Sequence, residues 1–132
     1  MRTSEDVERY LKESAVPYQD LGGGMFIVND LRSGLDNLAI KVQDNVVVFA
    51  LRLFDVPAVG APSREALFEK LLRLNSDGLL HSAFALQEES VYLQAALPLQ
   101  NLDANEIQAV LDDMGLASSQ HVPALRDTVA IN

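Results

Sequence analysis

The sequence contains no cysteine and no tryptophan, and only 2 of its 132 residues are histidine. Without cysteine the chain can form no disulfide and has no thiol nucleophile, which fits a reducing compartment such as the cytoplasm. His81 and His121 stand in neither an H-x-x-x-H nor an H-x-E frame. We therefore expect no metal site and no cofactor.

Long hydrophobic runs are also missing. No apolar run approaches the ~18 residues of a membrane helix, and the first ten residues lack the apolar core of a signal peptide. We therefore expect no membrane insertion. Basic residues are few, because 10 Lys and Arg face 19 Asp and Glu, which gives a net charge of −9. Such a surface argues against nucleic-acid binding. It suits a protein that displays apolar surface in solution, and the alternative is that it simply keeps a cytosolic protein dispersed.

Catalytic motifs are absent as well. Gly22–Gly24 precede strand-like residues rather than a helix start with Lys-Ser/Thr, which favours a flexible turn over a phosphate-binding loop. The acid pairs fall in a predicted hairpin turn (Glu88-Glu89) and on a predicted helix surface (Asp112-Asp113). Paired carboxylates catalyse acid–base reactions when burial or mutual repulsion separates their pKa values, and neither place suggests such an environment. Ser118 and Ser119 have no obvious neighbouring side chain that could act as the general base of a nucleophilic serine. We therefore expect no enzyme.

Hydrophobic periodicity predicts a helix and a hairpin after Arg64. Leu67, Leu71 and Leu74 recur at i, i+4 and i+7, and Ser63 is the expected N-cap. Alternation then predicts two strands. Leu80, Phe84 and Leu86 face one way on the first strand, and Val91, Leu93 and Leu97 share one side of the second. Neither element can bury its apolar side alone, so the helix should cover the hairpin.

A second helix is predicted from Asp103, which has capping-box spacing with Glu106. One face of it carries Ile107, Val110, Leu111 and Met114. Gly115 weakens a helix by ~1 kcal/mol relative to alanine, and Pro123 interrupts one. We therefore expect residues 114–132 to be a kinked or frayed extension of a single domain that spans residues 1–132.

The residues before Arg64 predict a short helix and a set of strands. Val7, Tyr10 and Leu11 share one helix face, and Pro17 ends that helix. Strand-like segments follow at residues 18–21 and 25–28.

The clearest hairpin joins residues 38–42 to residues 46–53 through Asp44-Asn45. Its second strand is apolar on both faces, with Val46 and Val48 on one side and Val47 and Phe49 on the other. A strand that is apolar on both faces is expected to be covered on both faces of the sheet. The domain's own helices would cover one face, and a partner could cover the other. Across all elements, the predicted core contains Phe49, Leu71, Phe84, Leu93 and Leu111.

Three segments carry a resemblance to a known family: Leu71-Leu72-Arg73-Leu74-Asn75, Ala96-Leu97-Pro98-Leu99, and the acid-capped helix from Asp103. Over about residues 3–114, and most strongly from Phe68 onward, the chain resembles the class I chaperones of type III secretion, the Tir chaperone family. The related YbjN family shares this fold and is almost as similar. The resemblance implies an α+β fold in which an antiparallel sheet packs against helices, in the order helix, three strands, helix, two strands, helix.

The resemblance also implies a function. Such proteins are cytoplasmic homodimers that hold the N-terminal segment of an exported protein in extended form, through strand addition and burial of a helix in a groove. The alternative is a YbjN-like regulatory or structural domain that binds another partner without catalysis.

Two surfaces are candidate binding sites for an exported segment. One is the first helix, and the other is formed by the early strands; the candidate residues are Val7, Tyr10, Leu11, Met25, Ile27, Val46 and Val48. Core packing is the alternative for each residue, and Val46 and Val48 are favoured because Val47 and Phe49 can supply the core face. Ala66, Phe68 and Leu72 point away from the Leu67 face of their helix and form the candidate dimer interface.

Overall fold

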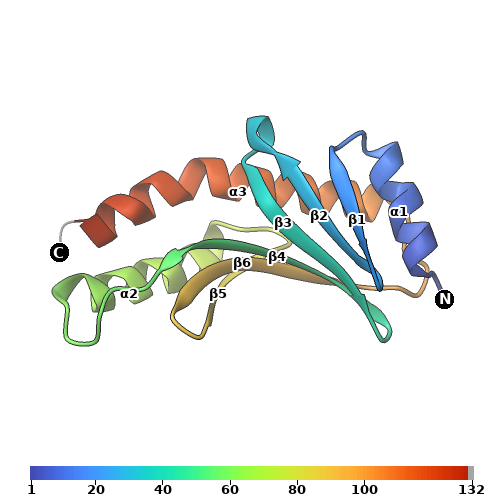
Figure 1. Cartoon of the computed structure of the whole chain (residues 1–132). Helices are drawn as coiled ribbons and strands as arrows, with labels where there is room; N and C mark the ends of the chain where they lie inside the picture. The colour runs from blue at the N-terminus through green and yellow to red at the C-terminus, as the bar shows by residue number, and fades with distance from the viewer. Residues whose placement is uncertain (131–132) are drawn as a thin grey trace.

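A single antiparallel sheet and three helices make up the computed structural model, which describes residues 1–130 (Figure 1). The elements are α1 (Ser4–Glu13), β1 (Tyr18–Gly22), β2 (Met25–Asp30), the 3-10 helix η1 (Leu31–Ser33), β3 (Leu35–Gln43), β4 (Val46–Asp55), α2 (Pro62–Asp77), β5 (Ala83–Gln87), β6 (Ser90–Pro98) and α3 (Ala104–Ala130). The sheet order is β1-β2-β3-β4-β6-β5, so β1 and β5 are the edges. The predicted α+β class is confirmed.

The sheet has one strand more than the resemblance implied. Four strands, not three, precede α2, because β1 pairs fully with β2, from Tyr18 opposite Val28 to Asp20 opposite Phe26. The Asn29 N–H donates to the Pro17 carbonyl oxygen over 3.2 Å and extends this pairing by one residue.

Burial alternates along the strands, and the buried side chains lie on the face that the helices cover. In β4, Val47 and Phe49 are fully buried while Val46 and Val48 are half-buried, as the alternation predicted. The five predicted core residues are also buried, and none is more than 6% exposed: Phe49, Leu71, Phe84, Leu93 and Leu111. The sequence therefore assigns the inward phase of these elements correctly.

The start of α2 differs from the prediction. The helix begins at Pro62, with Ala61 at the N-cap, and Ser63 lies inside the first turn. Proline suits the first helical position because its fixed φ is already helical and its missing N–H would have no partner there. Ser63 is therefore a buried helical residue, not the cap.

Leu80 does not belong to the hairpin, which corrects the predicted alternation. β5 begins only at Ala83, and Leu80 is 86% exposed. The cause is Asp113 of α3, which is buried rather than on the helix surface. Its carboxylate accepts the N–H groups of Leu80 (3.3 Å) and His81 (3.0 Å) and the Ser82 hydroxyl (2.7 Å). These bonds hold the linker away from β6.

The restart expected at Pro123 does not occur, because α3 is one helix from Ala104 to Ala130. A Cβ on Gly115 would lie 2.2 Å from the Ser33 carbonyl oxygen, so glycine here permits η1 to approach the helix. Beyond it, the exposed Pro123 stands between the buried Val122 and Leu125. Burial of this side of the helix holds the segment in place, and residues 131–132 lie outside the described part.

Candidate functional site

One face of the sheet has no helix on it. The helices lie on the opposite face, where α3 runs across the strands, α2 packs against α3 and β5, and α1 lies beside β1 (Figure 1). Strand register places several cross-strand rows of side chains on the uncovered face, and the residues named next form its central part. We call these residues the open face: Met25, Ile27, Ala39, Lys41, Val46, Val48, Ala50, Gln94 and Ala96.

The open face is apolar in a chain that is otherwise strongly acidic. Lys41 is the one charged residue of this set, and it lies between Met25 on β2 and Val48 on β4. Arg52, opposite Tyr92, adds a second positive charge where the face continues toward the end of β4. Most members are half-buried by their neighbours, whereas Lys41 and Ala96 are exposed. An apolar sheet surface with few charges is suited to contact with another apolar segment.

The structure brings four of the predicted binding residues together on this face: Met25, Ile27, Val46 and Val48. The other three lie elsewhere. Val7 and Leu11 are 0% exposed and Tyr10 is 5% exposed. The Tyr10 hydroxyl donates to the Leu102 carbonyl oxygen over 3.1 Å. The apolar face of α1 therefore belongs to the core and offers nothing to an outside segment.

Sequence reasoning missed Ala39, Ala50, Gln94 and Ala96. Small or amide side chains carry no alternation signal of their own, so their place follows only from register. Ala50 lies opposite both Ala39 and Gln94, and Ala96 lies opposite Val48. Pairing β4 with β6 in the sequence would have found Gln94 and Ala96, but 34 intervening residues hide that pairing.

The edge strand β1 borders the open face and has free backbone groups. Because Asn29 bonds to Pro17, the alternation of an antiparallel ladder turns the Gln19 groups toward β2. The N–H and C=O groups of Tyr18 and Asp20 therefore point away from the sheet. An extended chain could pair with them.

The candidate dimer residues lie on α2 beside β5. Leu72 is 70% exposed, Ala66 is exposed, and Phe68 is partly buried. Leu86 of β5, which is 49% exposed, lies across a cavity of about 330 Å³. The lining of this cavity is almost entirely apolar: Phe68, Leu71, Leu72, Asn75, Phe84, Ala85 and Leu86. This surface is separate from the open face.

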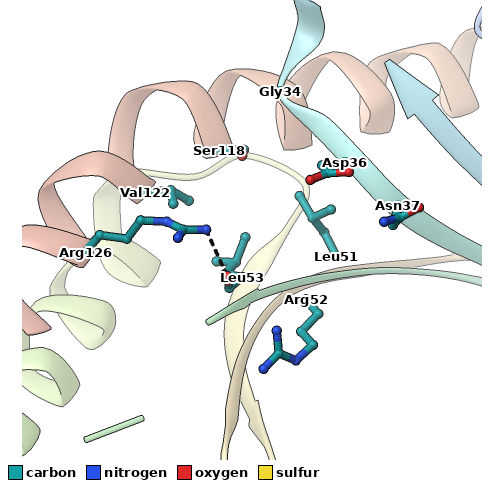
Figure 2. A pocket seen from close by; sticks show the side chains of 9 residues that line it. All are labelled: Gly34, Asp36, Asn37, Leu51, Arg52, Leu53, Ser118, Val122 and Arg126. Carbon is teal, nitrogen blue, oxygen red and sulfur yellow. Dashed lines mark hydrogen bonds between the residues drawn. The ribbon is translucent and has the colours of Figure 1, made fainter. Parts of the chain in front are cut away.

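A second hollow, of about 300 Å³, lies where α3 meets β3 and β4 (Figure 2). Arg126 reaches into it and donates to the Leu53 carbonyl oxygen over 3.1 Å. Arg52 points away from Arg126 in Figure 2 and pairs instead with Asp55. The guanidinium of Arg126 therefore serves to hold α3 on the sheet.

Two acidic groups near α1, Asp6 and Tyr18, have shifted pKa values. The Thr3 N–H donates to Asp6 over 2.9 Å and holds the pKa of Asp6 below its ordinary value. Partial burial, and then the hydrogen bond to Glu8, raises the pKa of Tyr18. Because the Asp6 pKa is depressed, its contribution to stability is present at neutral pH and is lost on acidification. These groups secure α1, and they lie off the open face.

Residues 1–130 contain no group of three His, Asp or Glu side chains able to hold a metal ion. Within the same residues, no helix has the length and apolar character needed to cross a membrane.

Solved structures with this fold include YbjN of E. coli, with a TM-score of 0.63, 12% identity and coverage of 92% of this chain and 94% of YbjN. The ExoU–SpcU complex from the type III secretion system of Pseudomonas aeruginosa matches with a TM-score of 0.61 and 16% identity, and the match covers 89% of this chain and 95% of the matched chain. The structure of the type III secretion chaperone SycH of Yersinia pestis, in complex with a fragment of YscM2, matches with a TM-score of 0.59 and 15% identity. This match covers 88% of this chain and 96% of the matched chain. At such identities the likeness shows the fold alone.

No curated protein matches the sequence. The family model CesT_Tir_1, in contrast, matches residues 1–130, nearly the entire chain. The chain therefore belongs to the CesT_Tir_1 family, the Tir chaperone family that its sequence resembles.

Proposed function

We propose that this protein is a cytoplasmic chaperone that holds an extended segment of an exported protein on its open face. The observation that carries the proposal is that face itself: a largely apolar sheet surface on which the charges of Lys41 and Arg52 are positive, in a chain of net charge −9. Carboxylates elsewhere keep the protein dispersed while this surface stays uncovered. The role is binding and not catalysis, which agrees with the membership of the Tir chaperone family.

The adjoining edge suits the same partner. An extended segment that pairs with Tyr18 and Asp20 of β1 would place alternate side chains toward the open face. Backbone hydrogen bonds would supply affinity that does not depend on the sequence of the bound segment. Side-chain contacts with Ile27 and Met25 would favour segments with matching apolar residues. A segment held in this way stays extended, as export of an unfolded chain requires.

A Val46→Thr, Val48→Thr double variant tests this placement. Threonine keeps the β-propensity of valine but replaces one methyl group with a hydroxyl at each position. We expect wild-type unfolding and oligomeric state, with binding weakened about tenfold. The partner is first identified from native lysate by mass spectrometry, and its N-terminal peptide is then titrated by calorimetry.

Val59→Thr is the matched control, because Val59 is 85% exposed and lies outside the open face. Unchanged affinity in the double variant would contradict the placement of the segment. Loss of folding would assign both valines to the core. A stoichiometric partner that is folded throughout and is not exported would favour the YbjN-like alternative.

We also propose that the protein is a homodimer, formed through α2. Leu72, Phe68 and Ala66 present apolar surface that the core does not use, next to the cavity at Leu86. A two-fold axis through this region would bury both copies of the surface.

Replacing Leu72 with aspartate should convert the dimer into a soluble monomer, because a charge would be buried at the interface without a partner. Sedimentation velocity measures the change. Leu31→Asp is the control, since Leu31 is 74% exposed and lies in η1, far from α2 in the chain. A wild-type protein that is monomeric at tens of micromolar would end this proposal.

A further inference from the structure

The edge strand β5 lacks the usual protection of a sheet edge. Its sequence, from Ala83 to Gln87, contains no charge and no proline. An apolar strand of this kind at an edge pairs readily with a strand of another molecule. The opposite edge, β1, carries Asp20 and ends in the turn at Gly22–Gly24.

The side chain of Asn75, near the end of α2, lies where the next strand would lie. Its Oδ1 accepts the Phe84 N–H over 2.7 Å, and its Nδ2 donates to the Phe84 carbonyl oxygen over 3.0 Å. A carboxamide has the same donor and acceptor as a peptide group. Asn75 therefore makes the two hydrogen bonds that a neighbouring strand would make to this residue.

Few outward backbone groups remain on this edge. Because the Phe84 groups point toward Asn75, the ladder alternation turns those of Ala83 and Ala85 toward β6. Ahead of the strand, the N–H groups of Leu80 and His81 are taken by Asp113. Within β5, the alternation leaves only Leu86 with outward groups.

We propose that Asn75 closes the β5 edge against strand addition by a second copy of this chain. The surface formed by α2 and β5 then offers a partner side chains and the backbone groups of Leu86 alone within β5, so pairing along a whole strand is confined to β1. This inference concerns copies of the chain itself, so it does not rest on the proposed function.

Two substitutions of Asn75 test the inference. Asn75→Ala opens the edge, and we expect assemblies larger than those of the wild type in sedimentation velocity at tens to hundreds of micromolar. In dilute samples the Phe84 amide should exchange its hydrogen about tenfold faster. Asn75→Asp keeps the acceptor for the Phe84 N–H and adds a charge to the edge, so it should remain the size of the wild type.

Asn105→Ala, at an exposed position of α3, is the control for loss of an asparagine. The inference is overturned if Asn75→Ala keeps the wild-type size, or if the alanine and aspartate variants associate equally, since general destabilisation would then be the cause. If the alanine variant does not fold, amide hydrogen exchange in the wild-type protein tests the inference instead. Slow hydrogen exchange at the Phe84 amide together with fast exchange at the Leu86 amide supports the closed edge, and equal exchange rates at the two amides overturn the inference.

Discussion

Truncation of Phe84 to alanine is expected to lower the free energy of unfolding by ~3–5 kcal/mol, most of the stability of a small domain. Phe84 is 5% exposed and lines the cavity beneath α2 together with Leu71. Its ring also meets the edge of His121 of α3, with ring centroids 6.5 Å apart. Losing it would leave β5 without its main contact with both helices. Chemical denaturation measures the loss.

Leu86→Ala, on the same strand and half exposed, is the matched control and should cost much less. Both variants keep the backbone that Asn75 binds, so they separate side-chain burial from edge protection. A loss below about 1 kcal/mol for Phe84→Ala would show that this ring is not part of the core.

Gly115→Ala should destabilise the protein by about 1–3 kcal/mol, although alanine is the better helix former. The new Cβ would lie 2.2 Å from the Ser33 carbonyl oxygen, and backbone on both sides would have to move. Gly34 faces the same contact, because a Cβ there would lie 2.9 Å from the Gly115 carbonyl oxygen. The clash outweighs the ~1 kcal/mol gained in helix propensity.

Thermal and urea unfolding measure this change, and Gln120→Ala at an exposed position of α3 should alter stability by less than about 0.5 kcal/mol. A more stable Gly115→Ala protein would mean that η1 does not rest on the helix. The sign of the change therefore distinguishes a packing glycine from a helix-weakening one.

Local patterns in the sequence predicted the elements and their inward faces, because periodicity reports burial directly. Phe49 and Leu93 are examples, since each stands among alternating residues and is fully buried. The turn at Asp44 is another, because its φ of 55° is the conformation that an asparagine-rich or aspartate-rich turn tolerates.

Contacts between distant segments could not be predicted in the same way. Asp113 was expected on a surface, and it is buried because the linker after α2 supplies its three donors. Nothing in the sequence indicated that Asn75 contacts a strand, yet its side chain makes hydrogen bonds with the backbone of Phe84 in β5, nine residues further along the chain. The interruption expected in α3 failed for the same reason: Gly115 reflects contact with η1, which periodicity does not report.

The position of β6 between β4 and β5 has a consequence for the order of folding. The first four strands pair with their sequence neighbours, so short loops close them quickly. β6 must arrive after α2 and β5 and insert beside β4, a pairing that joins Val47 to Leu97 across 49 intervening residues. Until then β4, the strand that is apolar on both faces, is a temporary sheet edge. We therefore expect the half-formed chain to be the species most prone to aggregation during synthesis, and docking of β6 to be the slow step that ends this exposure.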